Sequence, residues 1–185
     1  MSDDDAVHRA WSNGHWLELD LRTNRYGLAE AEHLELAQQR RLRRHNLLLE
    51  DVRTAPRNLI PAPSMVGRFV RAQFIAHRSR HLKIADQVRV LQSRSQPRPT
   101  TTLDVAETAA AYQYLRTFRP DRVACLADSV AAYLFASAYL QDIEFVVAVR
   151  YPPFHAHAWV ESQGYILNDT KKNAEGFSDM LRFGR

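Results

Sequence analysis

Polar and apolar positions alternate over His15–Leu21, a pattern that is typical of a β-strand. The three leucines of His15–Leu21 lie two residues apart, and Trp, Glu and Asp side chains lie between them on the opposite face. This strand is separated from Ala6–Trp11 by Asn13-Gly14, a strong hairpin signal, because both residues accept positive φ. Thr23-Asn24 predicts a second turn, and Arg25–Leu28 a short third strand at the sheet edge. The pattern therefore predicts a three-stranded β-meander.

Helical spacing follows the meander. Leucines among polar residues predict a helix from Ala29 to about Arg44 and a second helical segment over Asn46–Thr54. Three prolines between residues 56 and 63 interrupt this pattern, and Ser64 is then expected to cap a further helix. Its apolar face is predicted to contain Val66, Phe69, Val70, Phe74 and Ile75, with arginines 68, 71, 78 and 80 on the other side. The composition of Ser93–Thr102 is that of a flexible joint.

Two helices are predicted beyond this joint. Thr102 or Asp104 caps the first, which continues through an alanine-rich stretch until Pro120 ends it. The second begins near Cys125 and extends to about Leu140.

Three strands are predicted after these helices. Ile143–Val149 is a β-branched run of the kind found in strands that are buried on both faces. Ala156–Glu161 and Tyr165–Asp169 are the next two strands, and a short Gly-containing turn joins them. The order of helices and strands predicts an α+β fold.

The composition excludes several classes of protein. A chain of 185 residues suits one mid-sized domain or two small ones, and 45% hydrophobic with 25% charged residues excludes wholesale disorder. No apolar run approaches the roughly 18 residues of a membrane span, and the acidic start, Met1–Asp5, is not a secretory signal. The single cysteine, Cys125, cannot form an internal disulfide or, alone, a structural zinc site. We therefore expect a reducing, cytoplasmic location.

Positive charge is concentrated in the middle of the chain. Residues 40–100 contain 14 basic and 3 acidic side chains, whereas both flanking regions are net acidic. A surface this basic favours an acidic partner, which could be a peptide, a protein or a nucleic acid. The run that includes Arg40, Arg41, Arg43 and Arg44 fits a solvated helical face, and the alternative is a docking surface for an acidic leader segment or a partner enzyme.

Cys125 is a candidate nucleophile because it lies where a helix should begin. Unpaired N–H groups and the positive end of the helix dipole stabilise a thiolate and lower the pKa of the thiol. The structural alternative is a packed core cysteine, since free cysteine is among the most buried residue types.

Hairpin geometry pairs a histidine with a carboxylate. If Glu161 and Tyr165 close the turn, His157 lies opposite Asp169 on the same face of two antiparallel strands. A carboxylate at that distance orients an imidazole and stabilises its protonated form. His155, two residues away on the same face, is the competing base. A cysteine, histidine and aspartate in this order are typical of a papain- or transglutaminase-like site.

Three segments together resemble the lasso peptide biosynthesis B proteins. They are ACLADS at 124–129, VVAVRYPPFHAHAWVE at 146–161 and GYILND at 164–169. The resemblance covers roughly residues 105–175, and Ala148 stands where the family often has glycine. It implies a transglutaminase- or papain-like cysteine peptidase core, with Cys125 as nucleophile, His157 as general base and acid, and Asp169 as the orienting carboxylate. It implies no cofactor and no metal.

The resemblance also implies a division of the chain. Residues 1–60 would form a winged-helix-like leader-recognition element, 61–102 a helical connector and linker, and 103–185 the peptidase domain. The leader of a precursor peptide would add as a strand beside Arg25, Tyr26, Gly27 and Leu28. An ATP-dependent, asparagine-synthetase-like lasso cyclase is the implied partner, which closes the ring after leader removal; no membrane partner is implied.

Two alternatives remain open. A transglutaminase or acyltransferase on the same fold would pass the thioester to an amine, because its first half-reaction is identical. A non-catalytic adaptor would bind leader peptide or DNA and use Cys125 only for packing. DNA binding is the less favoured of these, because it leaves the Cys/His/Asp set unexplained.

Overall fold

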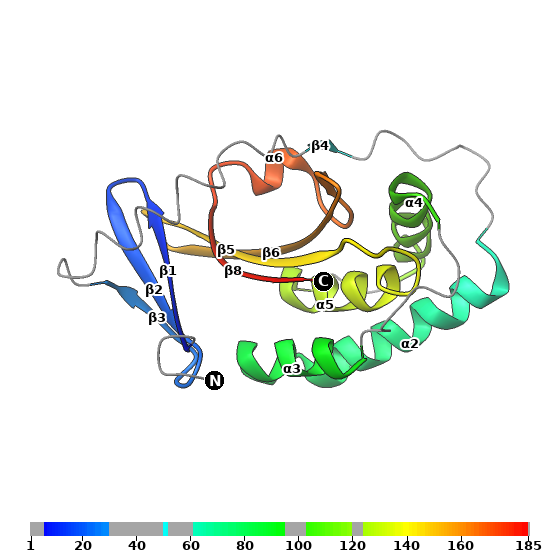
Figure 1. Ribbon diagram of the computed structural model, residues 1–185, viewed down its shortest axis with the longest axis horizontal. Helices are drawn as coiled ribbons and strands as arrows, with labels where there is room; N and C mark the ends of the chain where they lie inside the picture. Colours follow the sequence, from blue (N-terminus) through cyan, green and yellow to red (C-terminus); the bar gives the residue numbers. More distant parts are fainter. Residues whose placement is uncertain (1–5, 30–49, 52–60, 95–102, 120–123, 185) are drawn as a thin grey trace.

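The computed structural model describes residues 6–29, 50–51, 61–94, 103–119 and 124–184, and these form a mixed helix-and-strand architecture. A three-stranded sheet has the order β1-β2-β3, and a five-stranded sheet has the order β4-β7-β6-β5-β8 (Figure 1). The strands are β1 (Val7–Ser12), β2 (His15–Asp20), β3 (Arg25–Leu28), β4 (Glu50–Asp51), β5 (Glu144–Arg150), β6 (His155–Ser162), β7 (Tyr165–Ile166) and β8 (Ser178–Gly184). The helices are α2 (Pro63–Ser79), α3 (Ile84–Arg94), α4 (Val105–Arg116), α5 (Cys125–Ala136) and α6 (Lys171–Ala174).

The N-terminal meander forms as the alternation predicts. Asn13 and Gly14 adopt φ values of 45° and 89°, so a tight two-residue turn joins β1 to β2. Asn24, with φ 56°, lies in the second turn, and β3 is at an edge of its sheet. The three leucines of the middle strand and its flank are at most 7% exposed. Their side chains belong to the same hydrophobic core as the helices and the large sheet.

Hydrogen bonds fix this meander to the rest of the molecule. Asn13 Nδ2 donates to the carbonyl of Tyr151 at 2.8 Å, and the Tyr151 N–H donates to Ser12 Oγ at 3.0 Å. At the other end of the sheet, the Ile84 N–H donates to Asn24 Oδ1 at 2.9 Å. The meander is therefore held against the β5–β6 turn and the start of α3.

Strand β5 lies near the centre of the large sheet and is buried on both faces, as predicted. Phe145, Val147 and Val149 face α5 and belong to the main core. Val146 and Ala148 face the other way and form a smaller core that includes the α6 residue Ala174. Helix α5 packs against α2, α4 and the large sheet, which explains why the helix is almost entirely apolar.

Helix α2 begins two residues earlier than expected and buries a different face. Pro63 is its first residue, where the missing N–H has no intrahelical partner to lose, so Ser64 is not the N-cap. The buried residues are Met65, Phe69, Ala72, Ala76 and Ser79. Val66, Val70 and Phe74, which we expected to face the core, are 40%, 59% and 59% exposed. The small alanines face inward because α2 packs closely against α5.

Further boundaries differ from the prediction. Glu50–Asp51 form strand β4, which pairs in parallel with β7, although local spacing predicted a helix over Asn46–Thr54. Strand β7 ends at Ile166 rather than at Asp169, and α5 ends at Ala136 rather than near Leu140. The joint predicted over Ser93–Thr102 is wrong at its start, because Ser93 and Arg94 belong to α3. The rest of that joint, and the helix predicted from Ala29 to about Arg44 with its arginine run, lie outside the described residues apart from Ala29 itself.

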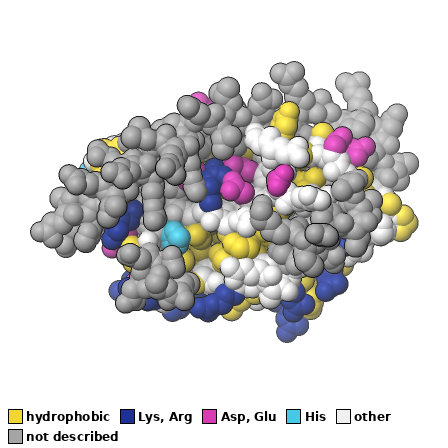
Figure 2. Space-filling view, viewed as in Figure 1, with side chains coloured by type: hydrophobic (Ala, Val, Ile, Leu, Met, Phe, Trp, Pro, Cys, Tyr) yellow, Lys and Arg dark blue, Asp and Glu magenta, His cyan; other side chains and the backbone are white. Residues whose placement is uncertain are grey.

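Lys and Arg side chains gather along the edge that α2 and α3 form (Figure 2). A groove of about 560 Å³ lies on these two helices, and its lining includes Arg71, Arg78 and Arg94 beside Phe74 and Leu82. Basic and apolar side chains are therefore interleaved on this surface. None of the helices among the described residues has the length and apolar character needed to cross a membrane.

A buried charge cluster joins three strands of the large sheet. Arg182 on β8 donates to Glu161 at 2.7 Å, to Asp179 at 2.8 Å and to Glu144 at 2.5 Å. The Glu161 side chain is 5% exposed and also accepts a hydrogen bond from the Trp159 indole at 2.6 Å. Although burial opposes the charge, these carboxylates raise the pKa of Arg182 above its ordinary value.

We expect Arg182→Met to lower the free energy of unfolding by about 3–5 kcal/mol, because Glu161 is then left buried without its cation. Chemical denaturation measures the loss. Arg89→Ala is the matched control, since the Arg89–Asp86 pair has exposed partners, and it should cost less than about 1 kcal/mol. Equal losses in the two variants would show that the cluster is not a structural anchor.

Candidate active site

Cys125 is the first residue of α5, as the sequence predicted. The N-cap residue, Ala124, offers no side-chain hydrogen bond, so the helix start presents unpaired N–H groups. A hydrogen bond with His157 is the main cause that lowers the pKa of the Cys125 thiol. Burial opposes this shift, and the backbone N–H groups of Ala158 and Leu126 reinforce it. The thiol is therefore placed and polarised for thiolate formation.

His157 on β6 contacts Asp169, with 2.5 Å between His157 Nε2 and Asp169 Oδ2. Their side chains are 18% and 15% exposed. The carboxylate, together with Cys125, raises the pKa of His157 to about 9. Burial alone would raise the pKa of Asp169, but hydrogen bonds from His157, Asn173 and Thr170 outweigh it and lower that pKa. The lowered pKa of Cys125 and the raised pKa of His157 both favour a thiolate–imidazolium pair.

Aromatic rings fix the plane of the imidazole. The His157 ring lies 5.7 Å from the Trp159 ring and 5.4 Å from the Phe177 ring, measured between centroids. The Arg150 guanidinium lies 4.8 Å from the centroid of Phe177. His155, the competing base, is exposed and pairs through the backbone ladder with Arg150. Of the two histidines, His157 is the one that contacts Asp169.

The predicted hairpin register is wrong by one residue. A two-residue turn, Gln163-Gly164, joins β6 to β7, with φ values of 50° and 84°. Ser162 therefore pairs with Tyr165, where the sequence suggested that Glu161 would. In the observed register Asp169 would lie opposite Ala158, with its side chain on the wrong face for His157.

The contact forms because the chain leaves the sheet before Asp169. The last backbone bond runs from Leu167 N–H to the Val160 carbonyl at 2.9 Å, and Val160 N–H then donates to the side chain of Asn168. Asp169 is freed from the ladder, and its Oδ1 accepts hydrogen bonds from Thr170 N–H and Asn173 Nδ2, both at 2.7 Å. Helix α6, which contains Asn173, thus fixes one carboxylate oxygen while the other meets His157.

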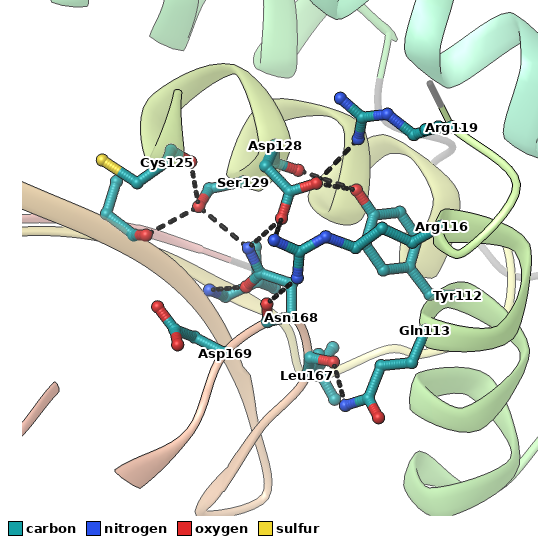
Figure 3. A network of polar contacts seen from close by, with 12 residues as sticks. Tyr112, Gln113, Arg116, Arg119, Cys125, Asp128, Ser129, Leu167, Asn168 and Asp169 are labelled. Atoms are coloured by element: carbon teal, nitrogen blue, oxygen red, sulfur yellow. Dashed lines mark hydrogen bonds and ion pairs between the residues drawn. The ribbon is translucent and has the colours of Figure 1, made fainter. Parts of the chain in front are cut away.

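A buried polar network lies behind the site, and sequence reasoning did not find it (Figure 3). Asp128, whose side chain is 2% exposed, contacts Arg119 Nη1 at 2.8 Å and Tyr112 Oη at 2.9 Å. Asn168 Nδ2 donates to Asp128 and to Ser129 Oγ, both at 3.1 Å. The one signal in the sequence is the presence of Asp128 and Ser129 in an otherwise apolar helix.

Three of the four residues expected to bind a leader line a single pocket. Tyr26, Gly27 and Leu28 help to line a pocket of about 380 Å³, whereas Arg25 is not part of its lining. Leu17, Tyr151 and Phe154 complete it. The rings of Tyr26 and Phe154 lie 5.1 Å apart. Burial, reinforced by the charge of Cys125, raises the pKa of Tyr26 to about 12. The edge of the meander therefore reaches the neighbourhood of the candidate nucleophile.

Comparison with known proteins identifies the family. A family model described as the transglutaminase-like superfamily matches residues 65–182, which extend from the first turn of α2 into β8. No curated protein and no solved structure matches the chain. The matched residues include Cys125, His157 and Asp169, and members of this superfamily are typically cysteine peptidases or acyltransferases. Because the match covers more than half of its length, the chain belongs to the transglutaminase-like superfamily.

Proposed function

We propose that this protein is a cysteine peptidase that removes the leader from a ribosomally synthesised lasso precursor peptide. The observation that carries the proposal is the chain of contacts from the Cys125 thiol through His157 to Asp169. The substrate class rests on the resemblance of residues 124–129, 146–161 and 164–169 to the lasso peptide biosynthesis B proteins.

The chemistry follows from the protonation states of the pair. The Cys125 thiolate attacks the carbonyl carbon of the leader–core amide, and the backbone N–H at the start of α5 is placed to stabilise the resulting oxyanion. Protonated His157 then gives its proton to the leaving core amine, and a thioester to the leader remains. His157 next takes a proton from water, the hydroxide attacks the thioester, and the leader acid and the thiolate are released. Asp169 keeps the imidazole oriented throughout.

Substrate binding is proposed at the edge of the meander. Residues 1–60 would act as a winged-helix-like recognition element, followed by the connector at 61–102 and the peptidase domain at 103–185. An extended leader would add to β3 through backbone hydrogen bonds beside Arg25, Tyr26, Gly27 and Leu28. The 58% exposure of Leu28 and the apolar pocket beside it support this docking. The released core amine would pass to the ATP-dependent lasso cyclase.

Mass spectrometry of the protein incubated with a lasso precursor peptide tests the function. We expect two products, free leader acid and free core, whose summed mass exceeds that of the precursor by one water. A cross-linked product without that water would contradict hydrolysis and identify amide transfer instead.

Cys125→Ala should lower the cleavage rate at least about 1,000-fold, because no other nucleophile can form the thioester. Leader affinity, measured by fluorescence anisotropy, should stay within about two-fold, since the β3 edge is unchanged. Cleavage that survives this substitution would show that Cys125 is not the nucleophile.

The thiol should react with iodoacetamide well below the pH at which an ordinary cysteine does, because its pKa is lowered. The alkylation rate should change again near pH 9, where His157 loses its proton and the thiolate–imidazolium pair is lost.

Asp169→Asn removes the main cause of the raised His157 pKa. The substitution should therefore shift the pH profile of thiol alkylation to higher pH and slow cleavage by orders of magnitude. Asp86→Asn on the distant surface of α3 is the control. Superimposable profiles for the Asp169 variant and wild type would refute the coupling.

Leu28→Ala should weaken leader affinity about ten-fold and leave turnover at saturating peptide nearly unchanged, because Leu28 is exposed and contributes to binding alone. Val70→Ala is matched to it in exposure but lies on α2, and it should change neither quantity. Equal losses of affinity and turnover in the Leu28 variant would argue against a separate recognition surface.

A further inference from the structure

The side chain of Asn168 is buried and fully bonded. It is 4% exposed, its Oδ1 accepts from Val160 N–H at 2.9 Å, and its Nδ2 donates to Asp128 Oδ2 and Ser129 Oγ, both at 3.1 Å. Turning the amide over would set its NH₂ against a backbone N–H and its oxygen against a carboxylate. Only one orientation of the amide therefore satisfies all three neighbours.

These three bonds reach the elements that carry the candidate catalytic side chains (Figure 3). Val160 lies on β6, the strand of His157. Asp128 and Ser129 lie one turn along α5 from Cys125. Asn168 itself directly precedes Asp169. One amide thus connects the thiol-bearing helix, the imidazole-bearing strand and the carboxylate-bearing segment.

Ser129 brings this connection to the backbone of the nucleophile. Its Oγ lies 2.8 Å from the Cys125 carbonyl and 2.8 Å from the Ala158 carbonyl. A hydroxyl has a single proton, so it donates to one of these carbonyls at a time while it accepts from Asn168. The start of α5 and the strand residue next to His157 are thereby held around one oxygen atom.

The charge of Asp128 determines which way the Asn168 amide is oriented. The buried Asp128 carboxylate lies 2.8 Å from Arg119 Nη1 and 3.4 Å from Arg116 Nη2. Arg116 Nη1 also donates to the backbone carbonyl of Asn168 at 2.7 Å. An ion-paired carboxylate only accepts hydrogen bonds, so it selects the NH₂ side of the Asn168 amide.

We propose that Asn168 is a positioning residue, whose amide sets the placement of the Cys125 thiol relative to the His157–Asp169 pair. The inference rests on the proposed function for its role in catalysis. The predicted property, the ionisation of the thiol, is measurable without any peptide.

Iodoacetamide alkylation of the full chain, followed across pH, is the test. Asn168→Ala should move the midpoint of thiol ionisation up by about one pH unit, which corresponds to roughly ten-fold slower alkylation at low pH. Thr108→Ala is the control, because Thr108 is also fully buried and its hydroxyl donates to the Asp104 carbonyl at the start of α4. The control should keep the wild-type midpoint even though it too loses a buried hydrogen bond. Circular dichroism confirms that each variant is folded.

An unchanged midpoint in folded Asn168→Ala would overturn the inference and leave Asn168 with a purely structural role. If that variant does not fold, Ser129→Ala serves instead, since it removes one hydroxyl and leaves the Asn168–Asp128 bond in place. It should raise the midpoint above that of the Thr108 control, and an identical midpoint would again overturn the inference.

A parallel cleavage assay separates this inference from the proposed function. If the midpoint of thiol ionisation is higher in Asn168→Ala than in wild type, but the wild-type protein cleaves no precursor, the positioning role is supported and the peptidase function is refuted. If the wild-type protein cleaves the precursor but Asn168→Ala has the same midpoint of thiol ionisation, the peptidase function is supported and the positioning role is refuted.

Discussion

The contact between the His157 imidazole and the Asp169 carboxylate is the interaction on which the rest of the site depends. The carboxylate stabilises the imidazolium, and the imidazolium in turn stabilises the thiolate of Cys125. The helix start alone would not lower the pKa of the Cys125 thiol, because burial of the thiol opposes its ionisation. Ionisation of the thiol is therefore favoured only while three elements far apart in the sequence keep these side chains in contact.

The fold meets this requirement by interrupting a sheet. Strand β7 has only two residues, and the Asn168 side chain replaces the backbone partner that Val160 would otherwise have. The interruption frees Asp169 from the alternation of the strand, and α6 then binds its second oxygen. A longer β7 would make the sheet more regular but would direct the Asp169 side chain away from His157. The sheet is irregular at the point where the Asp169 side chain must turn toward His157.

Features with local causes were predictable from the sequence. The Asn13-Gly14 turn and the helix start at Cys125 follow from residues adjacent in the chain. The His157–Asp169 contact was predicted from a register that is wrong by one residue, and it forms for a different reason, the departure of the chain from the sheet. Strand β8, the parallel pairing of β4 and the Asp128 network were not foreseen, because each depends on partners distant in sequence.

His157 is protonated in the resting protein because Asp169 and the Cys125 thiolate both stabilise its charge. The direct measurement is an NMR titration of the His157 ring in the wild-type chain, with the signal assigned by its loss in His157→Gln. We expect this ring to titrate near pH 9, well above an ordinary histidine. A His157 ring that titrates near pH 6.5 in the folded protein would contradict it.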